Sequence, residues 1–331
     1  MIWIQFLVCA ALIVYSGSRL SAYGDVIAER TGMGRTWIGV ILMASVTSLP
    51  ELVTGISSVA VYRLPDIATG DVLGSCMFNL LILAMLDIKR RGSPISAVAH
   101  EGHVLTAAFG VLMLGLIVMG IVAGPALPSI GWVGIYTPIL LIAYFLAMRA
   151  VFRYEKRKIA EFLTDVSEQD KYARLTGTGV WGRYAAHAAV IFIAASYLPE
   201  LGGELATVTG LGRSFAGTIF VAVTTSLPEV VVTRASLRLG AVDLAVGGIL
   251  GSNLFNAGIL AMDDACFAQG PILSHVSSSH AVTAASAVAM TAIVTIALSY
   301  RSGKRWLGFT WDSLANMSLF AAASYLLFRL R

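Results

Sequence analysis

The chain has 331 residues, of which 57% are hydrophobic and only 13% are charged, and its mean hydropathy is +0.80. An ordinary soluble domain carries about 25% charged residues, so water is not the main solvent of this protein. A membrane span takes about 20 apolar residues and a short link about 10, which leaves room for about ten spans and little else. The length therefore excludes a separate catalytic ectodomain or a DNA-binding module.

Ten apolar runs, separated by charged residues or by Gly and Pro, predict ten membrane-spanning helices. They lie near residues 1–18, 36–62, 67–87, 103–123, 131–152, 180–199, 213–237, 243–263, 278–299 and 311–328. The first run contains no Lys or Arg before Arg19, so it lacks the basic start of a secretory signal peptide and is expected to be retained. The expected fold class is an all-α, multi-pass membrane protein.

The basic residues predict the orientation of these spans. If the N-terminus lies outside, 19 of the 23 Lys and Arg residues fall in links on the inner side. Basic residues near the ends of spans accumulate on the cytoplasmic side, so both termini are predicted to lie outside. Nucleic acid is not an expected partner, because a nucleic-acid-binding protein gathers its basic charge on one face.

The two halves of the chain repeat each other. Three blocks align: "TGMGRTWIGV" at 31–40 with "TGLGRSFAGT" at 209–218, "ASVTSLPELV" at 44–53 with "AVTTSLPEVV" at 222–231, and "LGSCMFNLLIL" at 73–83 with "LGSNLFNAGIL" at 250–260. Because five predicted spans precede the second copy, the two copies enter the membrane from opposite sides. Such inverted repeats are typical of secondary transporters, whose site lies near the middle of the membrane.

The one long polar stretch divides the chain between these copies. We therefore expect a first inverted repeat over residues 1–152, a solvated cytoplasmic linker over 153–178 and a second inverted repeat over 179–331. Each repeat should contribute five helices.

Glu51 and Glu229 lie within apolar runs, where an ionised side chain costs about 2.5–3.5 kcal/mol or more. No Lys or Arg occurs in the aligned motifs that hold them, so the natural counter-charge is a bound cation. A protonated glutamate bonded between helices is the alternative, but it would have to arise in both halves. Pro50 and Pro228 cannot donate a backbone N–H, and each is expected to open its helix and free carbonyl oxygens.

Small and polar residues share helix faces with these glutamates. Ala44, Thr47, Ser48 and Glu51 follow helical spacing, as do Ala222, Thr225, Ser226 and Glu229, while Ser75 and Asn79 are four residues apart on the next helix, as are Ser252 and Asn256. On a single helix we would interpret such residues as packing residues. Two copies beside two carboxylates favour a site for a hard cation, such as Ca²⁺ or Na⁺, because every candidate ligand is an oxygen. Spacing alone does not separate calcium from sodium, manganese or a cadmium-like ion.

These residues resemble the cation/calcium exchanger superfamily, in its sodium/calcium exchanger branch, whose two alpha-repeats carry "GTSLPEL" and "GSNIFN"-type motifs. The resemblance covers about residues 31–83 and 209–260. It implies a ten-helix fold of two inverted five-helix halves, in which a long, tilted first and sixth helix slide to alternate access. It also implies a monomeric antiporter of the prokaryotic inner membrane, with no enzymatic activity and no cofactor beside the transported Ca²⁺ and Na⁺ or H⁺.

The resemblance also implies roles for individual residues. Glu51 and Glu229 would be shared calcium ligands, together with the backbone carbonyls of Thr47 and Thr225. Sodium ligands would be the carbonyls of Ala44 and Ala222, the side chains of Ser48, Ser226, Ser75 and Ser252, and groups of Thr47 and Thr225, while Asn79 and Asn256 would line the central site.

The sequence departs from the family pattern at several of these positions. Val46 and Thr224 replace a glycine, and Cys76 replaces the asparagine of the "GSN" triplet. Asn256 stands where an aspartate is common, whereas Asp71 stands where an uncharged asparagine is usual. These exchanges leave Na⁺ and H⁺ open as the coupling ion. Asp71 is predicted to lie in the outer access path, where it either joins the ion pathway or only forms hydrogen bonds.

Two other classes of protein fit less well. An ion channel normally builds its filter from symmetry-related subunits around one axis. A hydrolase within the membrane would need a group that activates a serine nucleophile, and no histidine is predicted at that depth. His100 and His103, at the start of one span, and Asp263 and Asp264, after another, are expected to meet water.

Overall fold

The computed structural model describes residues 1–30, 47–89, 92–162, 177–238, 240–301, 303–306 and 308–330. Its long helices are α1 (Ile2–Arg30), α4 (Pro65–Lys89), α6 (Gly102–Ala123), α7 (Tyr136–Phe162), α8 (Gly177–Thr209), α12 (Val242–Cys266), α13 (Ser279–Tyr300) and α14 (Trp311–Arg329). The shorter elements are α3 (Leu49–Ala60), α5 (Ile95–Val98), η1 (Gly124–Ala126), α9 (Arg213–Phe215), η2 (Ala216–Val221), α10 (Ala222–Thr225), α11 (Leu227–Arg238) and η3 (Ile272–Ser274). Two short antiparallel strands, β1 (Ser129–Ile130) and β2 (Val133–Gly134), join α6 to α7.

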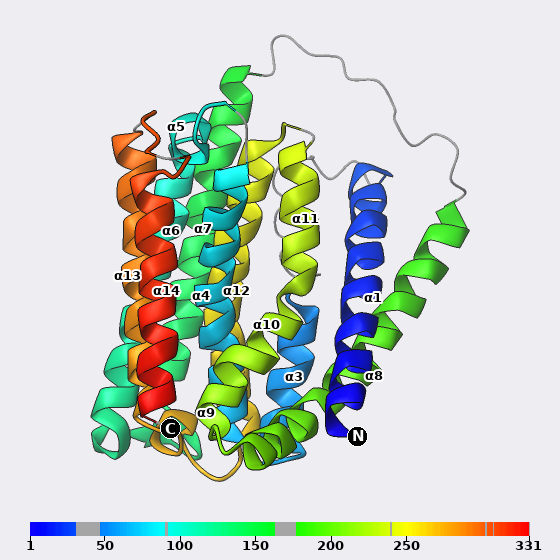
Figure 1. Ribbon diagram of the computed structural model, residues 1–331, viewed down its shortest axis with the longest axis vertical. Helices are drawn as coiled ribbons and strands as arrows, with labels where there is room; N and C mark the ends of the chain where they lie inside the picture. Colours follow the sequence, from blue (N-terminus) through cyan, green and yellow to red (C-terminus); the bar gives the residue numbers. More distant parts are fainter. Residues whose placement is uncertain are drawn as a thin grey trace.

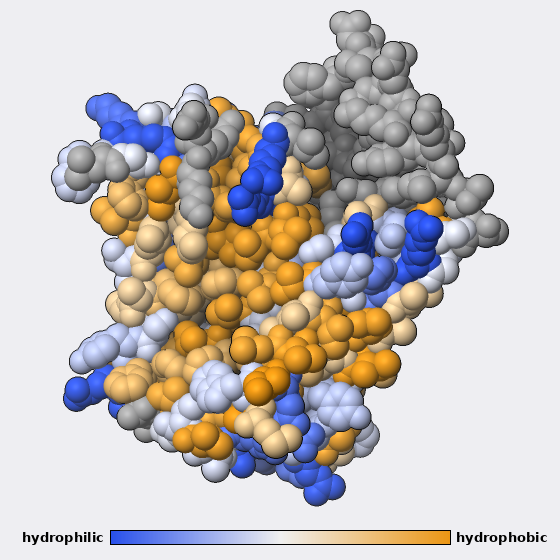
Figure 2. Space-filling view, turned by 45° about the vertical axis from the view of Figure 1, so that its right-hand side comes forward, coloured by the Kyte–Doolittle hydropathy of each residue, from blue (hydrophilic) through white to orange (hydrophobic). Residues whose placement is uncertain are grey.

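Helices occupy the positions of the predicted spans, and the all-α membrane fold class is confirmed (Figure 1). In the described part of the chain, seven helices are long and apolar enough to cross a membrane, and the bent run from α9 to α11 makes an eighth if it is one span. α3 and α14 lie at the other two predicted positions, and the predicted start of the second span, 36–46, lies outside the described residues. Figure 2 shows a broad apolar surface between more hydrophilic ends, as a lipid environment requires.

The helices form two groups with separate apolar cores. α4, α6, α7, α12, α13 and α14 share a large core that includes Leu80, Met113 and Leu140. α1 and α8 lie together at one side of this group in Figure 1, and the smaller core, which includes Ile13 and Leu198, also takes in Val53 of α3, Ile67 of α4 and Val221 of η2. α3, α10 and α11 lie between the two groups.

The chain termini lie at the same end of the molecule, which we call the terminal end (Figure 1). α7 ends and α8 begins at the opposite end, which we call the linker end. α1 and α8 have 29 and 33 residues. At 1.5 Å per residue these helices are about 44 and 50 Å long, more than the roughly 30 Å of a bilayer core, which favours the tilt that Figure 1 shows for α8.

A break in the helix precedes the glutamate of each repeat. α10 ends at Thr225, α11 begins at Leu227, and their run is bent by 43°. The expected break at Pro228 is therefore present. In the first repeat α3 begins at Leu49, and Pro50 lies in its first turn. A backbone N–H in the first turn has no acceptor within the helix, so the missing N–H of Pro50 costs no helical hydrogen bond. Residues 31–46, among them Val46, lie outside the described residues.

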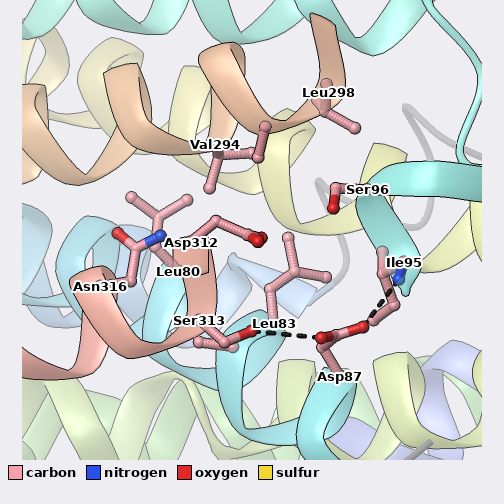
Figure 3. Close-up of a pocket in the computed structure, with 12 residues that line it drawn as sticks. Leu80, Leu83, Asp87, Ile95, Ser96, Val294, Leu298, Asp312, Ser313 and Asn316 are labelled. Carbon is pink, nitrogen blue, oxygen red and sulfur yellow. Dashed lines mark hydrogen bonds between the residues drawn. The ribbon is translucent and has the colours of Figure 1, made fainter. Parts of the chain in front are cut away.

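Two aspartates 177 residues apart fasten the ends of the central helices. Asp87, at the end of α4, accepts hydrogen bonds from the backbone N–H of Ile95 at 2.7 Å and from Ser313, beside a cavity of about 20 Å³ (Figure 3). Asp264, at the end of α12, accepts a hydrogen bond from the backbone N–H of Ile272 at 2.6 Å. The expectation that Asp264 meets water is wrong, because it is fully buried beneath the link that follows α12.

Two histidine–aspartate pairs join the halves in the same symmetric way. His103 of α6 lies 3.1 Å from Asp243 of α12, and His280 of α13 lies 3.1 Å from Asp66 of α4. The backbone N–H of His100 also donates to Asp243, at 2.7 Å. The expectation that His103 meets water is wrong, since its partner on the other repeat holds it in a position only 8% exposed.

Candidate functional site

The predicted site residues gather where the broken helices meet the middle of α4 and α12. The first repeat supplies Thr47 and Ser48 just before α3, Glu51 in α3, and Asp71, Ser75 and Asn79 in α4. The second repeat supplies Ala222 and Thr225 in α10, Ser226 at the break, Glu229 in α11, and Ser252 and Asn256 in α12. All of these residues are buried, and none is more than 3% exposed. The remaining predicted residue, Ala44, lies outside the described residues.

Glu51 of the first repeat faces hydroxyl groups of the second. Its Oε1 accepts a hydrogen bond from Ser226 at 2.9 Å and a long one from Ser75 at 3.5 Å. The Ser75 hydroxyl also reaches the Ala222 carbonyl oxygen at 3.4 Å. Thr225 donates to Asp71 Oδ1 at 2.7 Å, so that a second carboxylate lies beside this group. Hydroxyl, carbonyl and carboxylate oxygens thus converge from α3, α4 and α10.

Glu229 of the second repeat faces one hydroxyl group from each repeat. The hydroxyls of Thr47 and Ser252 face its carboxylate and lie 3.4 Å from each other. Among the described residues, neither Glu229 oxygen has a partner within hydrogen-bonding distance. Glu51 correspondingly has Thr225 of the second repeat and Ser75 of the first beside it. Each glutamate thus meets a threonine of the other repeat and a serine of its own.

The asparagines around the site behave differently from one another. Asn79 donates to Asn253 Oδ1 at 2.9 Å, and Asn253 donates to the backbone carbonyl of Cys76 at 3.1 Å. These bonds join α4 to α12 next to the glutamates. Asn256 has no hydrogen-bond partner for either side-chain atom within the described residues, nor does the hydroxyl of Ser48. Sequence reasoning missed Asn253, although it stands at the aligned position of Cys76.

The electrostatics of the site favour a cation. In the described part of the chain no Lys, Arg or His forms an ion pair with Glu51, Glu229 or Asp71. Glu51 and Glu229 lie in the first turns of α3 and α11, and the positive end of a helix dipole stabilises a carboxylate there. No three acidic, histidine or cysteine side chains of the described residues form a metal cluster, so hydroxyl and backbone oxygens would have to complete a coordination shell.

Comparison with known proteins gives the class to which this fold and site belong. The chain matches the family described as sodium/calcium exchanger protein over residues 1–152 and 180–330. Because the match covers nearly the whole chain, this protein belongs to the sodium/calcium exchanger family, a family of membrane cation-exchange transporters. The predicted membership is confirmed.

Individual relatives agree with this assignment. The inner membrane protein YrbG of Escherichia coli K12 is 26% identical over 247 residues, which are 74% of this chain and 73% of that protein. The sodium/calcium exchanger MaX1 of Methanosarcina acetivorans is 43% identical over 68 residues, 20% of this chain and 19% of that one. A structure of the sodium-calcium exchanger NCX_Mj covers 98% of this chain and 99% of its own, with a TM-score of 0.60 and 20% identity, and shows the same fold.

Proposed function

We propose that this protein exchanges Ca²⁺ for Na⁺ across a membrane by alternating access. The ions would bind between the two inverted repeats, at the site that Glu51 and Glu229 define. The transported ions are its substrates, and we expect the monomer to be the working unit. The names of MaX1 and NCX_Mj, both called sodium/calcium exchangers, support this substrate class.

The observation that carries the proposal is the pair of buried glutamates without a basic partner. A lone ionised carboxylate in an apolar interior is costly, and here two occur at related positions, each beside hydroxyl groups of both repeats. Carboxylates, hydroxyls and carbonyls are ligands for hard cations, and two carboxylates match the charge of one Ca²⁺. Binding of the ion would stabilise both charges at once.

The arrangement of helices supports alternating access. Among the described residues, the apolar cluster that holds α1 and α8 contains no residue of α6, α7, α13 or α14, which supports movement of α1 and α8 beside that group. The distribution of basic residues supports placing both termini outside and the linker over 153–178 in the cytoplasm, with repeats over 1–152 and 179–331. In a prokaryotic cell this would be the inner membrane.

A proton-coupled exchanger of Ca²⁺ or another divalent cation is the second candidate. The observation that favours it is the exchange of Asn256 and Asp71 relative to the family pattern, because it moves one carboxylate from α12 to α4. Calcium flux in vesicles with either a sodium gradient or a pH gradient separates the two coupling ions. Flux without any counter-ion gradient would indicate a channel instead.

The central test is to replace each glutamate by glutamine. Glu51→Gln and Glu229→Gln should each abolish calcium uptake driven by an opposing sodium or proton gradient, because one carboxylate does not replace the hydration shell of Ca²⁺. Glu204→Gln, which changes an exposed glutamate of α8, is the matched control and should transport like the parent. Parent-like uptake by either site variant, at equal protein level in the membrane, would refute the proposed site.

A further inference from the structure

Asp263 is a buried carboxylate that the fold does not satisfy. It lies in the last turn of α12, is 0% exposed, and has no hydrogen-bond partner for either oxygen within the described residues. Its neighbour Asp264 is equally buried but accepts hydrogen bonds from Gly134, Tyr136, Thr137 and Ile272. The expectation that Asp263 meets water is wrong, and structural bonding of the kind that Asp264 makes does not explain it.

The side chain of Asp263 points at α3, just beyond Glu51. A Cβ atom added to Gly55 would lie 2.6 Å from both Asp263 carboxylate oxygens. The carboxylate therefore fills the space that the missing side chain of this glycine leaves. Gly55 is four residues after Glu51 and shares its helix face, so Asp263 lies about one turn, or about 6 Å of helix rise, farther toward the terminal end.

Asp71 connects this carboxylate to the central site. Its Oδ1 is bonded to Thr225, whereas its Oδ2 has no partner in the described part of the chain. Asp71 lies within electrostatic range of the side chains of both Glu51 and Asp263. Three buried carboxylates thus follow one another from the centre of the molecule toward the terminal end, without a basic residue paired to any of them among the described residues.

The other half of the site lacks these two acids. The aligned blocks at 73–83 and 250–260 are 177 residues apart in the sequence. The same offset aligns Asp66 with Asp243 and Asp87 with Asp264. At that offset Gly248 corresponds to Asp71, and Leu86 corresponds to Asp263. The symmetric aspartates all have partners, whereas the two asymmetric ones have oxygens without partners. The additional negative charge therefore belongs to the terminal-end half of the pathway alone.

A protonated Asp263 does not remove the difficulty. A neutral carboxyl group still carries one O–H donor and acceptor lone pairs that a buried position has to satisfy. No described residue supplies a partner for either group. A bound cation with its remaining water ligands satisfies the oxygens and the charge together, and one divalent ion neutralises two carboxylates.

We propose that Asp263 and Asp71 form a second cation-binding position, between α3, α4 and α12 on the terminal-end side of the Glu51 and Glu229 site, that binds Ca²⁺. The inference rests on the proposed exchange function, because it makes this position a station that an ion occupies between the central site and the terminal-end face. Nothing equivalent exists at Leu86 and Gly248, so the station serves one face of the membrane only.

Equilibrium binding of radioactive Ca²⁺ to the purified full chain tests the position directly. A variant with both Glu51→Gln and Glu229→Gln should still bind one Ca²⁺ weakly, and adding Asp263→Asn should lower this affinity at least tenfold. Asp263→Leu, which introduces the residue of the other repeat, should do the same and serves if the asparagine variant folds poorly. If the double variant binds no Ca²⁺, or binds it equally after either change at Asp263, the second position does not exist.

Exchange measured from each face distinguishes this inference from the proposed function. Asp263→Asn alone should raise the KM for Ca²⁺ about tenfold on the terminal-end face and less than twofold on the linker-end face. Equal effects on both faces, or none, would overturn the asymmetric station while leaving exchange at the central site intact. Absence of any exchange by the parent would instead refute the proposed function, whatever the binding measurements show.

Discussion

At the scale of single residues, the acidic side chains within and around the site divide into two sets. Asp66, Asp87, Asp243 and Asp264 accept hydrogen bonds from backbone N–H groups and fasten helix ends. Glu51, Glu229, Asp71 and Asp263 retain oxygens without partners among the described residues. The first set is built for stability, whereas the second costs stability and is explained by ions that the structure has to accept and release.

This division predicts opposite effects on stability for two adjacent residues. Asp264→Ala should lower the free energy of unfolding by at least about 2 kcal/mol, because buried donors lose their acceptor. Asp263→Leu should be neutral or stabilising, since it removes an unpaired buried carboxylate. Melting temperatures of the purified variants in calcium-free detergent solution check both. A loss of stability at Asp263 as large as at Asp264 would show that its role is structural.

Asp71 leads to a prediction about coupling. If Asp71 joins the ion pathway, three carboxylates favour exchange of three monovalent ions per Ca²⁺, which moves net charge and responds to an imposed membrane potential. Asp71→Asn should then weaken that response. Its buried bond to Thr225, a predicted ligand, is the contact through which it would act. Calcium flux in vesicles at imposed potentials is the measurement. Exchange by the parent that ignores the potential, or an unchanged Asp71→Asn variant, would contradict it.

At the scale of elements, close contacts join the pair of long helices to the broken helix. A Cβ atom at Gly17 of α1 would lie 2.6 Å from Pro228 Cγ, and one at Gly202 of α8 would lie 2.8 Å from Val221 Cγ2. Small residues let helices approach closely within a membrane. Pro228 directly precedes Glu229, so a shift of α1 along this contact would reach the site.

Filling that contact should hinder transport. Gly17→Ala forces α1 away from Pro228, and we expect at least a tenfold lower exchange rate with smaller changes in ion affinity. Gly182→Ala, in a part of α8 where no atom lies within 4 Å of the added Cβ, is the matched control and should exchange at the parent rate. Initial rates in proteoliposomes, normalised to reconstituted protein, decide between them. Equal rates for the two variants would show that this contact does not matter for movement.

At the scale of the whole molecule, the charge distribution predicts its orientation. The linker is expected in the cytoplasm, so a cysteine placed by Ser167→Cys in the chain freed of its own three cysteines should resist an impermeant thiol reagent in intact cells. The same cysteine should react in inside-out vesicles. The reverse pattern would invert the topology and would assign the terminal end, with Asp263, to the cytoplasmic face.

Sequence alone determined the class of the protein, the repeat and the two glutamates. The hydropathy of a segment indicates whether it lies in lipid or in water, and a motif duplicated after an odd number of spans indicates inverted repeats. Neither inference requires knowing which helices are in contact. The family match and the exchanger fold confirm the class and the fold. The roles of the individual site residues stay predictions.

Only the tertiary structure decided which residues of distant helices meet. Helical spacing places Asp71, Ser75 and Asn79 on one face, but it does not say that Thr225 bonds Asp71. Asp263 and Asp264 are adjacent aspartates and equally buried, and the sequence predicts the same exposure to water for both. Packing against α3 leaves one without partners, while the strands and the link to α13 satisfy the other, because a side chain's environment is set by helices that lie far away in the chain.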